Sequence, residues 1–393
     1  MPKYNPIRDW LNSEAWDMPK TGNYAGIRKM AALLIETGVP VRRMRIATRV
    51  LHPLFKALSL TWSSDGDQVE ELEIPHEYED DDPRFVNTPL HTIFFEGAHA
   101  VRRRRGVSMC RNARPDPMED GMSDFAVFRM TFARLPIPEG AFSIATDAPE
   151  GFSKRDLNLI DDFMPALAHL AELYFFKEMT HTLLQTYLGK TPGERVMNGQ
   201  IRRGDVIDIR AVIWFADLRD STRLSATMPR ADYLALLNRY FDCVAGAVLD
   251  HGGEVLRYIG DAALAIFPAA TEGPETREAC LRAVAAAEEA RQRLERLNAE
   301  RALAQQHPID FGIGLHVGEL TYGNVGVPER LEFTVIGEAA NRAARLQNQS
   351  KVLRCPLVVS EDFAREHGGR WQRLGFMDTR DVAGGAAVFG PAD

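Results

Sequence analysis

The sequence predicts an α+β protein built from two domains. The chain has 393 residues, enough for two domains of ordinary size. Hydrophobic residues make up 45% and charged residues 26% of it, a balance typical of folded globular proteins. Strand-like and helical patterns alternate along the chain, and their character changes at a stretch rich in Gly and Pro. We therefore expect domains over residues 1–185 and 209–393, joined by a linker over residues 186–208.

The first domain combines helical periodicity with short strand-like runs, which predicts an α/β domain. A helix is expected over residues 27–37, and strands over residues 57–62, 125–129 and 141–145. A longer helix is expected after Ser153, which can cap it, and its apolar stripe continues to about Leu184. This helix is long enough to dock on the first domain and to pair with a second chain.

Charge and composition exclude several classes of protein. Acidic residues outnumber basic ones by 55 to 47, giving a formal net charge of −8, so a nucleic-acid partner is not expected. No stretch approaches the ~20 apolar residues of a membrane span, and the N-terminus lacks the apolar core of a signal peptide. We expect a soluble, cytoplasmic protein.

Its four cysteines lack metal-site spacing and are expected to be free thiols, mostly buried: Cys110, Cys243, Cys280 and Cys355.

The second domain begins with a continuous apolar run over residues 211–216, suited to a strand buried on both faces. A helix is expected after Pro229, with one apolar face formed by Leu234, Leu237, Phe241, Val244 and Val248. Strands follow over residues 254–259 and 262–267, then a helix over 275–299 and strands over 309–317 and 332–336, and a further helix over 338–347. The order β-α-β-β-α-β is that of a ferredoxin-like core.

Two carboxylates fall where this core predicts that they converge. Asp217 ends the first buried strand, and Asp261 lies at the tip of the following hairpin, which is a neighbour of that strand in the sheet. Two adjacent carboxylates are unfavourable without a cation between them, and Mg²⁺ prefers such oxygen ligands. The alternative is that Asp217 caps a helix and Asp261 forms a turn. We favour a metal site, followed by a helix start at residue 222 suited to phosphate.

A second polar cluster lies on the helix expected over residues 338–347. Asn341 and Arg345 are four residues apart and therefore share one face of that helix. An amide beside a guanidinium can hold a sugar and a phosphoryl group. The alternative is an ordinary polar surface helix.

These motifs together resemble the catalytic domain of the class III nucleotidyl cyclases, the adenylate and guanylate cyclase family. The resemblance covers about 180–200 residues, and the matching stretches occur in the same order as in the family. The matching stretches are residues 214–222, 252–261, 312–326 and 332–345.

The resemblance implies a role for each motif residue. Asp217 and Asp261 match the family's metal-binding aspartates, and the backbone carbonyl of Leu218 would also contact one of two Mg²⁺ or Mn²⁺ ions. Asn341 matches the residue that orients the ribose, and Arg345 the arginine that stabilises the transition state. Arg257 and Thr334 fall at the base-selecting positions, and Arg330 is a candidate contact for the triphosphate. The family's head-to-tail dimers imply a homodimer whose sites take the aspartates from one chain and the other residues from its partner.

The same resemblance favours ATP as substrate and 3′,5′-cyclic AMP as product. Thr334 is typical of adenylate cyclases, whereas Arg257 stands where they usually have Lys, and Asp220 stands where many members have Gly. A cyclase for GTP or a pyrimidine triphosphate, or a catalytically silent nucleotide-binding module, remains the alternative. Residues from about 40 to 185 resemble a GAF-type sensory domain, which implies an unknown small-molecule or protein regulator acting through the long helix.

Overall fold

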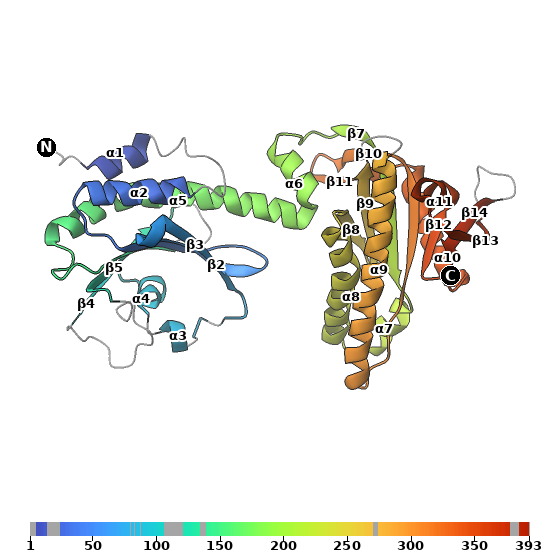
Figure 1. Cartoon of the computed structure of the whole chain (residues 1–393), viewed down its shortest axis with the longest axis horizontal. Helices are drawn as coiled ribbons and strands as arrows, with labels where there is room; N and C mark the ends of the chain where they lie inside the picture. The colour runs from blue at the N-terminus through green and yellow to red at the C-terminus, as the bar shows by residue number, and fades with distance from the viewer. Residues whose placement is uncertain are drawn as a thin grey trace. The chain divides into compact units, whose positions relative to one another are not determined.

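The computed structural model describes residues 5–13, 24–78, 80–81, 83–86, 88–105, 121–133, 139–269, 274–377 and 385–392, and Cys110 lies outside them. The chain divides into two compact units, Met1–Leu183 and Leu184–Asp393 (Figure 1). No helix in the described part is long and apolar enough to cross a membrane.

The described residues of the first unit form a six-stranded sheet in the order β3-β2-β1-β6-β5-β4. Its strands are β1 (Arg43–Arg49), β2 (Phe55–Ser63), β3 (Gln68–Pro75), β4 (Ala100–Arg104), β5 (Asp124–Thr131) and β6 (Glu139–Thr146). Every pairing in this sheet is antiparallel. The expected α/β character of this domain is therefore wrong, because its strands pair through antiparallel connections that need no crossover helix. The unit is α+β.

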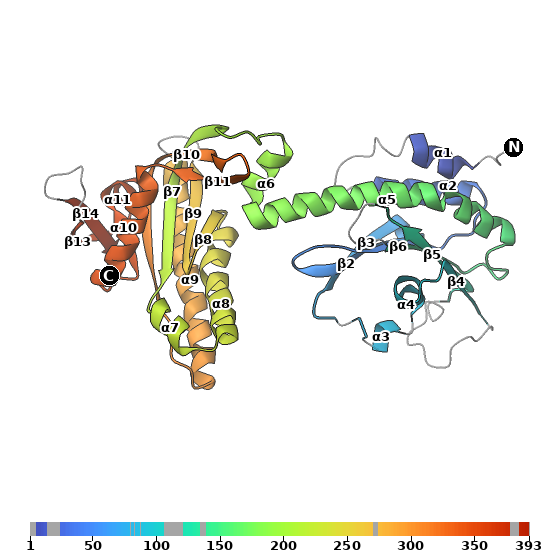
Figure 2. The ribbon, with the colours of Figure 1, turned by 180° about the vertical axis from the view of Figure 1, so that it is seen from behind.

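Helices cover both faces of this sheet. The helices are α1 (Pro6–Ser13), α2 (Ala25–Glu36), α3 (Pro83–Val86), α4 (Pro89–Phe95) and α5 (Lys154–Leu188), with a 3₁₀ turn at Asp65–Asp67. One face packs α1, α2 and α5 against residues such as Met44 and Phe142, and α4 lies on the other face through Ile93 (Figures 1 and 2). The long helix predicted after Ser153 is confirmed as α5.

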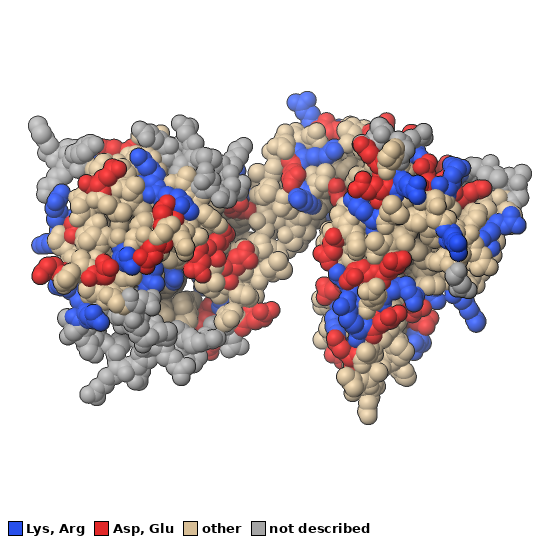
Figure 3. All heavy atoms as spheres, in the orientation of Figure 1, with Lys and Arg blue, Asp and Glu red and all other residues tan. Residues whose placement is uncertain are grey.

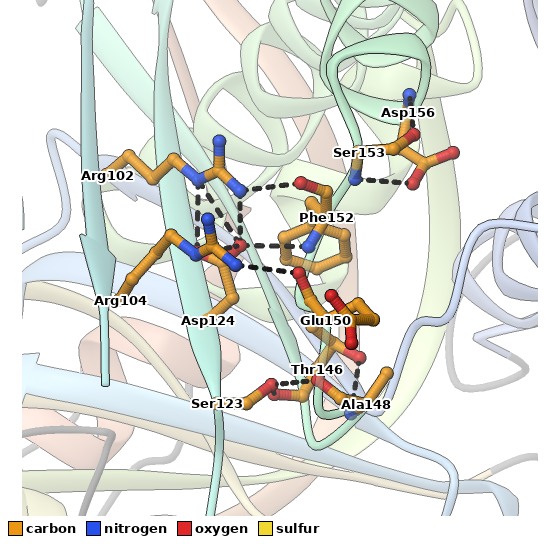
Figure 4. A network of polar contacts seen from close by, with 10 residues as sticks. All are labelled: Arg102, Arg104, Ser123, Asp124, Thr146, Ala148, Glu150, Phe152, Ser153 and Asp156. Carbon is orange, nitrogen blue, oxygen red and sulfur yellow. Dashed lines mark hydrogen bonds and ion pairs between the residues drawn. The ribbon is translucent and has the colours of Figure 1, made fainter. Parts of the chain in front are cut away.

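A buried ion pair holds the loop that leads into α5. Asp124 is fully buried, and its Oδ2 lies 2.5 Å from the Arg102 guanidinium and accepts a hydrogen bond from the backbone N–H of Phe152 at 2.8 Å (Figure 4). Arg102 also donates to the carbonyl oxygen of Phe152 at 2.6 Å. At the next residue, the Ser153 hydroxyl accepts from the N–H of Asp156, and the Asp156 carboxylate accepts from the N–H of Ser153. The start of α5 is therefore fixed to the sheet.

The second unit contains the predicted ferredoxin-like core. Its sheet has the order β13-β14-β12-β10-β7-β9-β8, with β11 paired to β10. The strands are β7 (Val206–Leu218), β8 (Glu254–Ile259), β9 (Ala262–Ala269), β10 (Phe311–Val327), β11 (Arg330–Ile336), β12 (Leu357–Ser360), β13 (Trp371–Met377) and β14 (Ala386–Pro391). The helices are α6 (Lys190–Met197), α7 (Ser221–Thr227), α8 (Arg230–Asp250), α9 (Pro274–Leu303), α10 (Glu338–Val352) and α11 (Glu361–His367).

The two faces of β7 pack against different elements. Because side chains alternate along a strand, Trp214 and Leu218 point toward α8 and α9, whereas Ile213 points toward α10. Asp217 lies in phase with Ile213 and so faces α10 as well. On α8 the expected apolar face is offset, because Tyr240 is fully buried while Leu234 is 58% exposed.

Acidic and basic side chains interleave over α8 and α9 on the face drawn in Figure 3. The guanidinium of Arg293 on α9 pairs with Asp250 of α8 at 2.5 Å and with Glu289 one turn earlier at 2.9 Å. Arg239 of α8 pairs with Glu300 of α9. This face therefore carries mixed charge.

The stretch expected as a linker, residues 186–208, is largely structured. It contains the end of α5, all of α6 and the start of β7. Gly189 has a φ of 97°, which breaks the helix between α5 and α6, and Pro192 lies in the first turn of α6, where a missing N–H is tolerated. The Thr191 hydroxyl donates to Glu254 of β8 at 2.7 Å, so α6 is tied to the sheet of the second unit.

Candidate active site

The two carboxylates predicted to converge do so at one end of the second sheet. Asp217 on β7 is paired in register with Ala262, the residue after Asp261, and Gly260 makes the hairpin turn with a φ of 64°. Burial raises the pKa of the Asp217 carboxyl above its usual value, and a hydrogen bond and negative charge from Asp261 raise it further. Two carboxyl groups therefore share this position.

Two side chains of α10 complete the surroundings of Asp217, and the sequence analysis missed both. Lys351 Nζ donates to Asp217 Oδ2 at 2.5 Å, and the Gln347 amide approaches the same oxygen at 3.5 Å. The Lys351 ammonium lowers the pKa of Asp217, opposing the effects of burial and of Asp261. The expected helix ended at Gln347, whereas α10 continues to Val352. The spacing of Gln347 and Lys351 by four residues was the available signal.

This pair of carboxylates fits a divalent cation. The half-buried Asp217 beside Asp261 already attracts one cationic group, the ammonium of Lys351. Mg²⁺ is commonly held by one or two carboxylates together with water and substrate phosphate oxygens. No cluster of three or more His, Cys, Asp or Glu side chains suited to a metal occurs among the described residues. Further ligands at Asp217 and Asp261 would therefore be backbone, water or substrate oxygens.

A buried tyrosine lies close to this site and was also missed. Tyr240 of α8 is fully buried, and its hydroxyl has no hydrogen-bond partner within the described part of the chain. Burial raises its pKa well above the usual value, and the charges of Asp217 and Asp261 add to this. Tyr240 lies one residue before Phe241 and was therefore not among the residues assigned to the expected apolar face.

The residues expected to select the base lie on β8 and β11. Arg257 forms an ion pair with Glu332, which precedes Thr334 by two residues and so shares its face of β11. Arg330, at the start of β11, is exposed. Glu332, to which the sequence analysis had assigned no role, therefore links Arg257 on β8 to the strand that carries Thr334.

Asn341 and Arg345 lie on the exposed surface of α10. At about 100° per residue, Arg345 projects about 160° around the helix from Gln347, which contacts Asp217. Arg345 therefore points away from the carboxylates of its own chain. The structure brings Asp217 and Asp261 together and Asn341 and Arg345 together, but within one chain it does not unite the two pairs.

Asp220 adopts a strained backbone conformation in the loop after these carboxylates. Its φ of 57° and ψ of 23° are left-handed, and it precedes α7 without a capping hydrogen bond from its side chain. The carboxylate instead lies 3.9 Å from the guanidinium of Arg223 and is largely exposed. The left-handed φ explains why glycine suits this position.

Comparison with known proteins identifies the class of the second unit. Residues 209–363 match the model of the adenylate and guanylate cyclase catalytic domain. These residues form a class III nucleotidyl cyclase catalytic domain, and the first unit lies outside the matched range.

The chain is also similar, over part of its length, to longer proteins. An uncharacterized protein of Mycobacterium tuberculosis is 36% identical over 155 residues, which are 39% of this chain and 27% of that protein. The adenylate cyclase of Anabaena cylindrica is 33% identical over 160 residues, 40% of this chain and 30% of the cyclase. The chain thus matches less than a third of the length of these relatives.

Among solved structures, the adenylyl cyclase CyaB from P. aeruginosa aligns with 48% of this chain and 96% of its own, at 21% identity and a TM-score of 0.43. The guanylyl cyclase Cya2 aligns with 48% of this chain and 93% of its own, at 24% identity and a TM-score of 0.40.

Proposed function

We propose that the chain is an adenylate cyclase that converts ATP to 3′,5′-cyclic AMP and pyrophosphate. The observation that carries the proposal is the arrangement of Asp217 and Asp261 at one end of the sheet, in a cyclase catalytic domain whose α10 exposes Asn341 and Arg345. ATP is favoured over GTP by Thr334 and by the cationic Arg257. The similarity to the Anabaena adenylate cyclase agrees with this choice.

The chain's own residues would divide the work of the reaction. The ribose 3′-oxygen attacks the α-phosphorus in line, the bond from that phosphorus to the bridging oxygen breaks, and the hydroxyl proton passes to solvent. Asn341 would orient the ribose, and the fixed charge of Arg345 would stabilise the developing charge on the phosphoryl oxygens. Asp217, Asp261 and the carbonyl of Leu218 would hold two Mg²⁺ or Mn²⁺ ions, which when bound lower the pKa of the 3′-hydroxyl and neutralise the triphosphate. Arg330 would contact the triphosphate.

The site would form between two copies of the chain. Arg345 points away from Asp217 of its own chain, so a complete set of residues requires a partner. Apolar side chains exposed beside the base-selecting residues support such an interface, among them Tyr258 and Ile259 on β8 and Ile336 on β11. A symmetric homodimer would then hold two equivalent sites.

The first unit would regulate this activity. We retain the GAF-like assignment as part of the proposal, with a small molecule or protein as its ligand. The support is the attachment of the start of α5 to the sheet through Asp124 and Phe152, which ties the sheet to the helix leading toward the second unit.

The direct test is to incubate the purified chain with ATP, GTP, CTP or UTP and Mg²⁺ or Mn²⁺, and to identify cyclic products by mass spectrometry. We expect cyclic AMP from ATP. Formation of a different cyclic nucleotide alone would reject the adenylate assignment, and absence of any cyclic product would favour a silent module.

Mixing two inactive variants tests the shared site. Asp217→Asn and Arg345→Ala should each abolish turnover, and an equal mixture should recover activity from about a quarter of the sites, because each mixed dimer keeps one intact site. Mixed dimers that form but stay inactive would contradict the arrangement across chains.

A further inference from the structure

The ammonium group of Lys351 lies beside Asp217, the predicted metal ligand of the same chain. Lys351 Nζ lies 2.5 Å from Asp217 Oδ2, and the side chain of Asp217 is 18% exposed. Among the described residues, no other Lys or Arg forms an ion pair with Asp217 or Asp261. The ammonium is therefore the cationic side chain that pairs with this carboxyl cluster.

A divalent cation and this ammonium compete for the same carboxylate oxygen, because both are positively charged. A metal ligated by Asp217 Oδ2 would lie within a few ångströms of Lys351 Nζ, and like charges at such a distance repel strongly away from bulk water. Metal binding at Asp217 Oδ2 should thus drive the ammonium away from this oxygen. The side chain of Lys351 is 44% exposed, long and flexible, so its ammonium can turn away from Asp217 into solvent.

The helix that carries Lys351 also carries the residues expected to act in the partner's site. Gln347 and Lys351 form one pair of side chains four residues apart and face Asp217, whereas Asn341 and Arg345 form another such pair on an exposed face. Ala343 and Leu346 are fully buried beneath the helix. One rigid helix therefore connects the carboxylate of its own chain to the ribose- and phosphate-binding residues offered to the partner.

A second contact joins the end of α10 to the same loop. Arg219, two residues after Asp217, donates to the carbonyl oxygen of Ser350 at 3.3 Å and to that of Cys355 at 3.4 Å. The last turn of α10 is therefore held by Lys351 and Arg219 to the segment that contains Asp217.

We propose that Lys351 is an internal counter-cation that a divalent metal displaces from Asp217, and that this displacement links metal binding in one site to the position of α10. The inference rests on the proposed metal-binding role of Asp217. In a dimer with shared sites, occupation of one site by metal would loosen the helix that contributes Asn341 and Arg345 to the other site.

The test measures Mn²⁺ binding to the full-length chain without nucleotide, by electron paramagnetic resonance at constant ionic strength. Lys351→Met keeps the length of the side chain and removes its charge. It should bind Mn²⁺ roughly two- to fivefold more tightly, the range expected from removing one partly exposed ion pair. Unchanged or weaker binding by Lys351→Met would overturn the proposal.

Arg354→Met provides the matched control, because it removes a cation three residues away that forms no ion pair with Asp217. Its Mn²⁺ affinity should stay within about twofold of that of the unmodified chain. An equal gain in both variants would show a general charge effect and reject a specific role for Lys351. Asp217→Asn should lose this Mn²⁺ binding and leave the signal of free Mn²⁺ undiminished, which confirms that the site measured is the one described.

Hydrogen–deuterium exchange of residues 338–352 tests the link to α10. Mn²⁺ should increase exchange in the last turn of α10 in the unmodified chain, whereas Lys351→Met should already exchange faster and respond less to the metal. A metal response of α10 that is identical in the two proteins would reject the link. Both readouts are independent of turnover, so a failed proposal for Lys351 is distinguishable from an absence of cyclase activity.

Discussion

Arg257 on β8 is held by an ion pair with Glu332 on β11, two residues before Thr334 on the same face of that strand. The planar guanidinium is thereby fixed beside the second base-selecting position instead of being free to turn. Because a guanidinium presents several donors in a rigid fork, its orientation decides which acceptors of a base it can reach.

Glu332→Gln should weaken the discrimination between ATP and GTP. Without the carboxylate, Arg257 is free to donate to the acceptor edge of guanine, so the ratio of kcat/KM for ATP to that for GTP should fall by about three- to tenfold. The measurement is product formation with each nucleotide at several concentrations. Arg330→Gln is the control, because it removes a charge from β11 without touching this pair. An unchanged ratio in Glu332→Gln would show that Glu332 does not orient Arg257 for base selection.

Asp220→Gly should both relax the backbone and improve substrate binding. A left-handed φ costs a non-glycine residue about 1 kcal/mol, partly offset by the greater freedom of glycine in the unfolded chain, so we expect a gain in stability of about 0.5 kcal/mol. Removing the carboxylate near the expected triphosphate should also lower KM. Denaturant unfolding and steady-state kinetics measure the two effects.

Asp220→Asn separates these effects, because asparagine tolerates the left-handed conformation but is neutral. It should lower KM as Asp220→Gly does, with little change in stability. If KM fell in Asp220→Gly alone, backbone relaxation and not charge would be responsible.

The central sheet and the carboxylate pair could be predicted because their signals are local. The apolar run before Asp217 and the hairpin around Gly260 and Asp261 each predict a strand, and the core topology then brings the two acids together. The end of α10 could not be predicted this way. Residues 347–351 are polar, so apolar periodicity stops, yet Gln347 and Ser350 are buried by contacts with distant strands. Tertiary packing therefore extended the helix and brought Lys351 to Asp217.

The apolar stripe of α8 shows a second limit of periodicity. Leu234 and Leu236 are equally hydrophobic, and several faces of the helix fit a spacing of three or four residues. The sheet selects the face that contains Leu236 and Tyr240 and leaves Leu234 exposed. The sheet against which α8 packs therefore determines which face of the helix is buried, and the helix sequence alone does not.

Gly151→Ala should destabilise the first unit by about 2–4 kcal/mol. Gly151 has a φ of 66°, and a Cβ atom there would lie 2.5 Å from Asp124 Oδ2, so alanine strains the backbone and also displaces a buried, paired carboxylate. Denaturant unfolding followed by circular dichroism measures the loss. Hydrogen exchange at the start of α5 should increase, because Asp124 no longer holds the N–H of Phe152.

Gly121→Ala is the matched control for this loss. Gly121 has a φ of 83°, and a Cβ atom there would meet no heavy atom of the described residues within 4 Å. It should therefore cost about 1 kcal/mol, the backbone strain alone. Equal losses in the two variants would show that the contact with Asp124 contributes nothing.

His316 should make the second unit less stable at acidic pH. This side chain is buried on β10, where its Nδ1 lies 2.8 Å from the Ser360 hydroxyl. Burial lowers the pKa of His316 from 6.5 to about 4, and the nearby charges of Arg342 and Arg210 lower it while Asp362 opposes them. Between these values the unfolded chain binds a proton that the folded chain does not. Stability from His316 is therefore present above about pH 6.5 and is lost as the pH falls toward 4.

The size of this effect is up to about 3 kcal/mol, from about 1.4 kcal/mol for each pKa unit. His316→Gln keeps a hydrogen-bonding partner for Ser360 and cannot be protonated. Urea unfolding of both proteins between pH 7 and pH 4.5 should show a smaller loss of stability in the variant than in the unmodified chain. Because the other titrating groups are shared, they cancel in this comparison. Parallel curves for the two proteins would mean that His316 is protonated in the folded state as readily as in the unfolded one.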